Sequence, residues 1–126
     1  MPLPRISRSE FAVMDAVWSL EAEDQPAGAA DIIDRLDARQ WTAKTVRSML
    51  SRLVAKGALA TEADGRRYLY TSLASREQVE ASAVRSLSDR LFGGRAAPLL
   101  SYLAEGEGLR DDDIAEIEAL IKKLKS

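Results

Sequence analysis

The amino-acid sequence begins with two segments in which apolar residues recur every three or four positions, the period of an amphipathic α-helix. The first helix is expected over residues 8 to about 20, because Ser7 and Glu10 have the spacing of a capping box at a helix start. Its buried face consists of Phe11, Met14, Val17 and Trp18. After the polar loop EAEDQPAG, a second helix is expected over residues 29–39. Its inner face consists of Ile32, Ile33 and Leu36.

A third helix is expected to begin after the N-cap Thr42 and to end near residues 56–57, where Gly57 favours a helix stop. Its core face consists of Val46, Met49, Leu50, Leu53 and Val54. The other face contains only bases and small polar side chains, namely Lys44, Thr45, Arg47, Ser48, Ser51 and Arg52. A solvated helix face usually mixes acids with bases, so a face without Asp or Glu indicates an anionic partner.

The hydrophobic period then changes from that of a helix to that of a strand. Residues 59–63 and 66–73 are predicted to form a hairpin around Asp64-Gly65, a dipeptide typical of tight turns. Tyr68 and Tyr70 would share one strand face, where packing in the wing is the expected role, with a bond from the hydroxyl of one of them to a phosphate as the alternative. Core packing is expected for Trp18 and Trp41. Three helices followed by a hairpin is the order of a winged helix, which we predict for residues 1–73.

Residues 74–126 carry three more helical patterns, separated by the glycine-containing segments 92–94 and 106–108. Helices are expected from Ser75 to about residue 91, over 97–105 and over 111–124. Their apolar stripes do not enclose a core of their own, so pairing with a second copy of the same segment is predicted. The predicted dimerisation residues are Leu87, Leu91, Phe92, Leu99, Leu100, Leu103, Ile114, Ile117, Leu120, Ile121 and Leu124. The predicted fold class is mainly α with a small β wing.

The residue types that are missing exclude several kinds of function. The chain contains neither His nor Cys, which rules out Cys/His zinc sites and nucleophilic catalysis by Cys or by a His-activated serine. The carboxylates of Asp34 and Asp37 lie on an exposed helix face with nothing to desolvate them, so no enzyme is predicted. The three acids at 111–113 suit the first turn of a helix, so no metal site or cofactor is predicted either. No apolar run approaches the roughly 18 residues of a membrane span, and no signal peptide is evident. A cytoplasmic protein without membrane insertion is expected.

The distribution of charge identifies the candidate interface. The formal net charge is −2, but residues 42–73 contain six bases against two acids, whereas residues 10–37 contain eight acids against one base. An α-helix fits the major groove of DNA, where Arg can bond guanine and Thr or Ser can reach bases or phosphates. The predicted DNA-binding residues are Thr42, Lys44, Thr45, Arg47, Ser48, Ser51, Arg52, Arg66 and Arg67. The alternative is a winged-helix module for protein-protein interaction without DNA binding, although such modules usually lose the basic face.

Two sequence blocks give this pattern a family resemblance. The first block is W-T-A-K-T-V at 41–46, which begins a capped helix, and the second is G-R-R-Y-L-Y at 65–70, in the predicted wing. The residues Ile6-Ser7 and Val17-Trp18 match the same family. The chain resembles the BlaI/MecI family of penicillinase repressors, which also contains the CopY copper repressors. The resemblance implies a homodimeric repressor that binds a palindromic operator in double-stranded DNA and interlocks through its C-terminal helices.

The resemblance also implies a proteolytic switch, from which this chain departs. In the family, a membrane sensor-protease detects a β-lactam and the repressor is cut at an Asn-Phe bond within its dimerisation segment. The corresponding position here is Ser101-Tyr102, which keeps an aromatic residue but lacks the Asn. The cysteine cluster of the copper branch is also missing, which excludes copper sensing by that route. Release by another regulatory protease or another signal is therefore expected.

Overall fold

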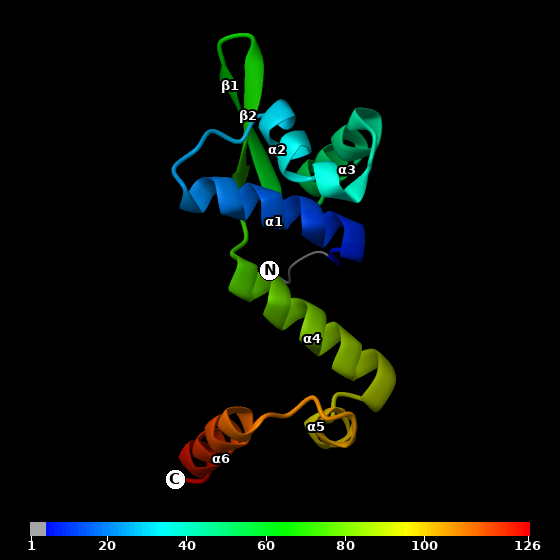
Figure 1. Ribbon diagram of the computed structural model, residues 1–126, viewed down its shortest axis with the longest axis vertical. Helices are drawn as coiled ribbons and strands as arrows, with labels where there is room; N and C mark the ends of the chain where they lie inside the picture. The colour runs from blue at the N-terminus through cyan, green and yellow to red at the C-terminus, as the bar shows by residue number, and fades with distance from the viewer. Residues whose placement is uncertain (1–4) are drawn as a thin grey trace. The chain divides into compact units, whose positions relative to one another are not determined.

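The computed structural model describes residues 5–126 (Figure 1), which form two compact units with the division between Ala83 and Val84. The elements are α1 Arg8–Ala22, α2 Ala29–Arg35, the 3-10 helix η1 Asp37–Arg39, α3 Ala43–Ala55, β1 Leu59–Asp64, β2 Arg67–Ser72, α4 Arg76–Phe92, α5 Ala96–Glu105 and α6 Asp111–Lys125. Helix α4 belongs to both units, because its first turns lie in the N-terminal unit and the remainder in the C-terminal one. Within residues 5–126, no helix combines the length and the apolar composition needed to cross a bilayer.

The core of the N-terminal unit lies where α1, α2 and α3 pack against one another and against the hairpin (Figure 1). Its fully buried side chains come from the apolar stripes of all three helices, as with Met14, Ile32 and Leu50. Trp18 and Trp41 are partly buried against this core, as the sequence predicted. The winged helix and the mainly α fold class are confirmed.

Two predicted element bounds in the N-terminal unit were wrong. A continuous helix over 29–39 was expected, but α2 ends at Arg35 because the Leu36 amide donates both to Ile32 O at 3.2 Å and to Ile33 O at 3.0 Å. This tightening starts η1, and the buried Leu36 side chain stays in the core. The hairpin turn is also shifted by one residue from Asp64-Gly65, because Asp64 pairs with Arg67 and leaves Gly65-Arg66 as the loop.

The hairpin is fastened to the loop that precedes α2. The amide of Tyr70 donates to Ala27 O at 2.9 Å, and Gly28 forms an isolated bridge with Leu69. Tyr70 packs against the core, which agrees with the packing role predicted for it. Tyr68 does not, since it is 63% exposed, and the packing predicted for this residue is wrong. The wing therefore has a fixed base and an exposed outer part.

One charged side chain is buried in the N-terminal unit. Glu10 is 1% exposed, and its Oε1 accepts hydrogen bonds from Ser7 N at 2.9 Å and from Lys56 Nζ at 2.6 Å. Burial alone would raise the pKa of this carboxyl, but the bonds from Lys56 and Ser7 outweigh it and hold the pKa below its usual value. The pair joins the start of α1 to the end of α3.

We expect Glu10→Gln to destabilise the protein at neutral pH by about 2 kcal/mol, because it removes a charge-assisted bond from a buried position. A carboxyl with a lowered folded-state pKa stabilises fully above its unfolded pKa of about 4.3, and this contribution is lost as the pH falls through the folded value. The stability difference between wild type and variant should therefore shrink in acid. Urea unfolding between neutral pH and about pH 3 measures it. Glu80→Gln, on an exposed carboxyl, is the control, and a difference that does not change with pH would contradict the prediction.

Candidate nucleic-acid interface

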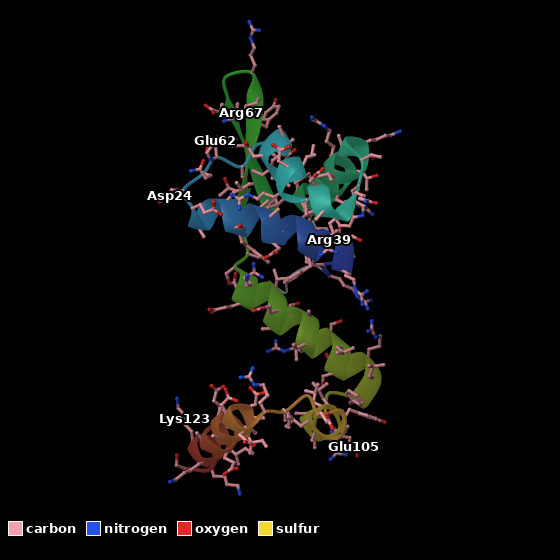
Figure 2. All side chains as sticks on the ribbon, in the orientation of Figure 1. Asp24, Arg39, Glu62, Arg67, Glu105 and Lys123 are labelled. Atoms are coloured by element: carbon pink, nitrogen blue, oxygen red, sulfur yellow. The ribbon has the colours of Figure 1, made fainter. Side chains whose placement is uncertain are left out.

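The third helix is held with one face in the core and the other in solvent. Its N-cap forms as the sequence predicted, since Thr42 Oγ1 accepts from Thr45 N at 3.1 Å. The apolar side is buried through Val46, Met49, Leu50 and Leu53. Every residue of the predicted recognition face is exposed, namely Thr42, Lys44, Thr45, Arg47, Ser48, Ser51 and Arg52. Figure 2 shows all the side chains of the described residues, those of α3 among them, on the ribbon.

The basic side chains on the outer face of α3 and in the hairpin loop have no acidic partners in the part of the chain that the structure describes. Within residues 5–126, Lys44, Arg47, Arg52 and Arg66 form no ion pair with a carboxylate. Bases elsewhere in the N-terminal unit do form such pairs, as Arg35 does with Glu23. A cluster of unpaired bases raises the local positive potential, which attracts an anion. The surface of α3 can therefore accept phosphates or base edges without first breaking an internal ion pair.

The two wing arginines lie in different environments. Arg66 occupies the hairpin loop and is exposed. The guanidinium of Arg67, labelled in Figure 2, lies 3.5 Å from Asp31 Oδ2 and 3.6 Å from Asp64 Oδ2. Asp31 Oδ2 also accepts from Gly28 N at 3.0 Å, at the start of α2. Arg66 is thus free to meet a partner, whereas Arg67 already has two carboxylates as neighbours.

A further exposed base, Arg39, was not singled out from the sequence. It is exposed at the end of η1, and its guanidinium carbon lies 5.7 Å from the centroid of the Trp41 ring. This cation-π contact holds a base close to the N-terminal end of α3. The available sequence signal was an arginine two residues before a tryptophan.

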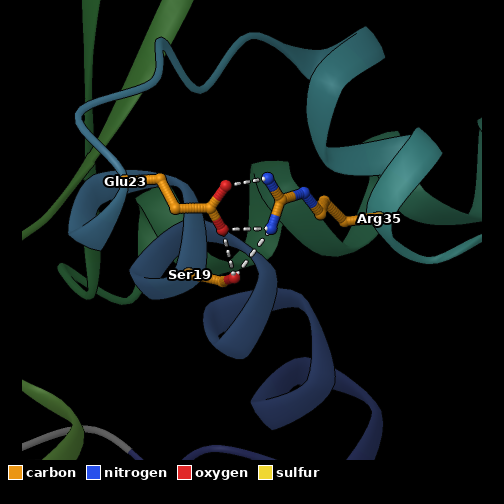
Figure 3. A network of polar contacts seen from close by, with 3 residues as sticks. All are labelled: Ser19, Glu23 and Arg35. Carbon is orange, nitrogen blue, oxygen red and sulfur yellow. Dashed lines mark hydrogen bonds and ion pairs between the residues drawn. The ribbon is translucent and has the colours of Figure 1, made fainter.

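A polar network fixes α2 on α1. Arg35 donates to both carboxylate oxygens of Glu23, at 2.6 and 2.7 Å, and to Ser19 Oγ at 2.9 Å (Figure 3). The hydrogen bonds from Arg35 lower the pKa of Glu23, and the same bonds raise the pKa of Arg35. Because these groups are exposed, the network orients α2 more than it stabilises the fold.

The predicted dimerisation residues keep their apolar side chains open in the C-terminal unit. Leu87, Phe92, Leu99 and Ile117 are half-buried, and the others are exposed, namely Leu91, Leu100, Leu103, Ile114, Leu120, Ile121 and Leu124. Ser101 and Tyr102 are exposed within α5, and the Tyr102 ring stacks on Phe92 with 5.9 Å between centroids. Among residues 84–126, no side chain is fully buried, so this unit has apolar faces without a core.

The helix order, the wing and the exposed recognition helix define the N-terminal unit as a winged helix-turn-helix of the kind found in transcription regulators. The chain belongs to the penicillinase repressor family, whose model matches residues 6–123. The "uncharacterized 16.5 kDa protein in ptsI 3′ region" of Latilactobacillus sakei is 34% identical over 117 residues, covering 92% of this chain and 77% of that protein. The methicillin resistance regulatory protein MecI of Mammaliicoccus sciuri is 27% identical over 119 residues, covering 94% of each chain.

A solved structure with a similar fold contains DNA. It is the monomeric form of Bacillus licheniformis BlaI in complex with the blaP half-operator, which is 31% identical to this chain. The match has a TM-score of 0.51 and covers 60% of this chain and 89% of that one. The family resemblance drawn from the sequence is confirmed.

Proposed function

We propose that this protein is a transcriptional repressor that binds operator DNA through α3 and the wing. The observation that carries the proposal is the outer face of α3, which is exposed, rich in bases and free of carboxylates. A face of this kind matches the negative potential of a DNA groove. The repressor family to which the chain belongs and the half-operator complex of the similar BlaI support it.

In the proposed complex, α3 enters the major groove. Arg47 and Arg52 contact base edges, since an arginine donates two parallel hydrogen bonds to guanine. Ser48 and Ser51 reach bases or phosphates from the same face. Phosphate is contacted near the start of α3 by Thr42, Lys44 and Thr45. The helix dipole also favours an anion at this end of the helix. On the wing, Arg66 and, more weakly, Arg67 contact the backbone.

The repressor acts as a homodimer on a palindromic operator in the cytoplasm. Residues 1–73 form the DNA-binding domain and 74–126 the dimerisation domain in this proposal. The support for the dimer is the set of open apolar faces in the C-terminal unit, with Leu120 55% and Ile121 45% exposed. Apolar area left in water is costly, and a two-fold pairing of identical segments removes it.

The test is a titration of the full chain with duplex DNA from the region upstream of its own gene, against a random duplex, over a range of salt concentrations. We expect tighter binding to the upstream duplex. Arg66→Ala should reduce the slope of log affinity against log salt by about 0.9 on both duplexes, because one fewer phosphate is neutralised. Arg67→Ala should change the slope less, because its guanidinium is already beside Asp31 and Asp64.

Lys123→Ala removes a base from α6 and should leave the slope unchanged. If no duplex bound even at low salt, the operator function would be wrong and the alternative of a protein-interaction module would replace it. Equal slopes for the Arg66→Ala and Arg67→Ala variants would contradict the distinction between the two wing positions.

Release from DNA by proteolysis within the dimerisation domain forms the last part of the proposal, with Ser101-Tyr102 as the bond that corresponds to the family's cleavage site. This bond lies inside α5, and proteases favour exposed, irregular segments over ordered helix. Together with the missing Asn, the helical setting disfavours the familiar β-lactam sensor-protease. Another regulatory protease or signal then releases the repressor.

We expect a β-lactam sensor-protease, co-expressed with this chain, to leave it intact after addition of the antibiotic. Mass spectrometry of the repressor, together with a reporter gene, measures the outcome. The matched variant carries Ser101→Asn with Tyr102→Phe, which restores the family's bond, and it should be cut faster. Rapid cleavage of the unchanged chain at Ser101-Tyr102 with derepression would refute the prediction.

A further inference from the structure

The segment that leads from the wing into α4 is tied to α1 at successive turns. Ser72 donates to Glu21 through its amide at 3.1 Å and its hydroxyl at 2.6 Å. One turn further toward the start of α1, Trp18 Nε1 donates to Ala74 O at 3.0 Å, and Ala74 is buried. The chain therefore runs along α1 between the last strand and the fourth helix.

The first residue of α4 continues this line of contacts. Arg76 forms an ion pair with Asp15, and its guanidinium carbon lies 5.0 Å from the Trp18 ring centroid and 5.9 Å from that of Phe11. The two rings meet edge to face, with 5.6 Å between centroids. We name this set of side chains, Phe11, Asp15, Trp18 and Arg76, the α1–α4 junction.

The junction adds little to folding stability by itself. The side chains of Arg76 and Asp15 are 45% and 52% exposed, and an ion pair so open to water stabilises a fold weakly. A base is also unfavourable in the first turn of a helix, where the dipole is positive. Helix α4 has its own capping box, with Ser75 N donating to Gln78 Oε1 at 2.9 Å and Gln78 N to Ser75 Oγ at 3.1 Å. The helix does not need Arg76 in order to form.

What the junction does is hold the first turn of α4 against α1. All its side chains lie in the N-terminal unit, and Val79, one turn into α4, is buried there as well. The same helix continues without a break to Phe92, in the unit that carries the dimerisation residues.

We propose that the α1–α4 junction selects the spacing between operator half-sites, by fixing the direction in which α4 leaves the DNA-binding unit. The inference rests on the proposed function as a dimeric repressor. Two recognition helices joined through a rigid exit accept one separation along the duplex, because each must meet the major groove on the same side. A loosened exit accepts several separations.

The experiment uses the full chain and the duplex that it selects from a random pool. Base pairs are inserted at the centre of symmetry of that duplex, over about one helical turn of 10 base pairs. For Arg76→Ala and for Asp15→Asn, we expect the ratio between affinities at the best spacing and half a turn away to fall by about tenfold. Affinity for an isolated half-site should stay within about twofold, since the recognition surface is unchanged.

Arg85→Ala removes a base from an exposed position on the same helix and should keep the wild-type spacing profile. Amide hydrogen exchange gives a readout that needs no DNA: the Arg76→Ala variant should exchange faster in residues 76–83, with no change in melting of the core. If Arg76→Ala unfolded the protein, the spacing profile of the Asp15→Asn variant would test the proposal by itself.

An unchanged spacing profile, with intact half-site binding, would overturn the role of the junction and leave the repressor function standing. If the wild-type chain selected no duplex at all, the proposed function would fall and this inference with it. The two failures are therefore distinguishable.

Discussion

Replacing Leu120 and Ile121 together by Asp is expected to turn the proposed homodimer into monomers and to weaken operator binding by about a hundredfold or more. Both side chains are largely exposed on α6, and each aspartate would bring a charge into an interface that buries apolar surface. A monomer keeps its recognition helix but loses the gain in effective concentration that comes from binding two half-sites at once. Sedimentation and titration with whole and half operators measure the two effects.

The matched control is Ala115→Asp with Ala119→Asp, which adds two acids to the same helix at positions away from the apolar stripe. It should remain dimeric. Affinity of the Leu120/Ile121 variant for a half-site should equal that of the wild type. If that variant remained dimeric at micromolar concentration, the interface would have to lie on other residues.

Arg47→Ala and Arg52→Ala are each expected to cost about 1–3 kcal/mol of operator affinity, which corresponds to roughly 5- to 150-fold. Both arginines are exposed on α3 and, within residues 5–126, unpaired, so truncation removes an interaction with DNA and breaks no internal bond. An arginine that bonds a base should also lose discrimination, so affinity for a random duplex should fall less than affinity for the operator. Competition between the two duplexes measures the ratio.

Arg90→Ala, an exposed base on α4, is the control for the general loss of a positive charge. Equal losses on operator and random duplex would assign Arg47 or Arg52 to phosphate contact rather than base recognition. No loss in either variant would mean that α3 is not the recognition element.

The features that the sequence predicted correctly depend on neighbours along the chain. The capping box of Ser7 and Glu10, the Thr42 cap and the apolar stripe of α3 all arise within one or two helical turns, and the structure has each of them. Local hydrogen bonding and the period of the helix are sufficient to specify such elements. The recognition face is exposed for the same reason, since it is the side left over when the apolar side is buried.

The charged contacts that the sequence pattern did not predict depend on tertiary structure. Arg67 has Asp31 as one of its two carboxylate neighbours, and Asp31 is distant in sequence and reaches the wing only in the folded unit. The early end of α2 at the Leu36 amide and the shifted turn between Asp64 and Arg67 are local details of hydrogen bonding that the apolar pattern does not specify. The α1–α4 junction joins residues more than fifty positions apart, which no pattern of apolar periods specifies.

The ion pair of Glu10 with Lys56 has a thermodynamic consequence for recognition. Lys56, the C-cap residue of α3, is paired with Glu10 of α1, and Thr42 caps the other end of the helix, so α3 is fully formed and tied to α1 before any partner arrives. A preorganised element loses little conformational entropy on docking. Binding should therefore be close to a rigid-body event, with a heat-capacity change no larger than the buried apolar surface accounts for and without the excess that accompanies folding on contact.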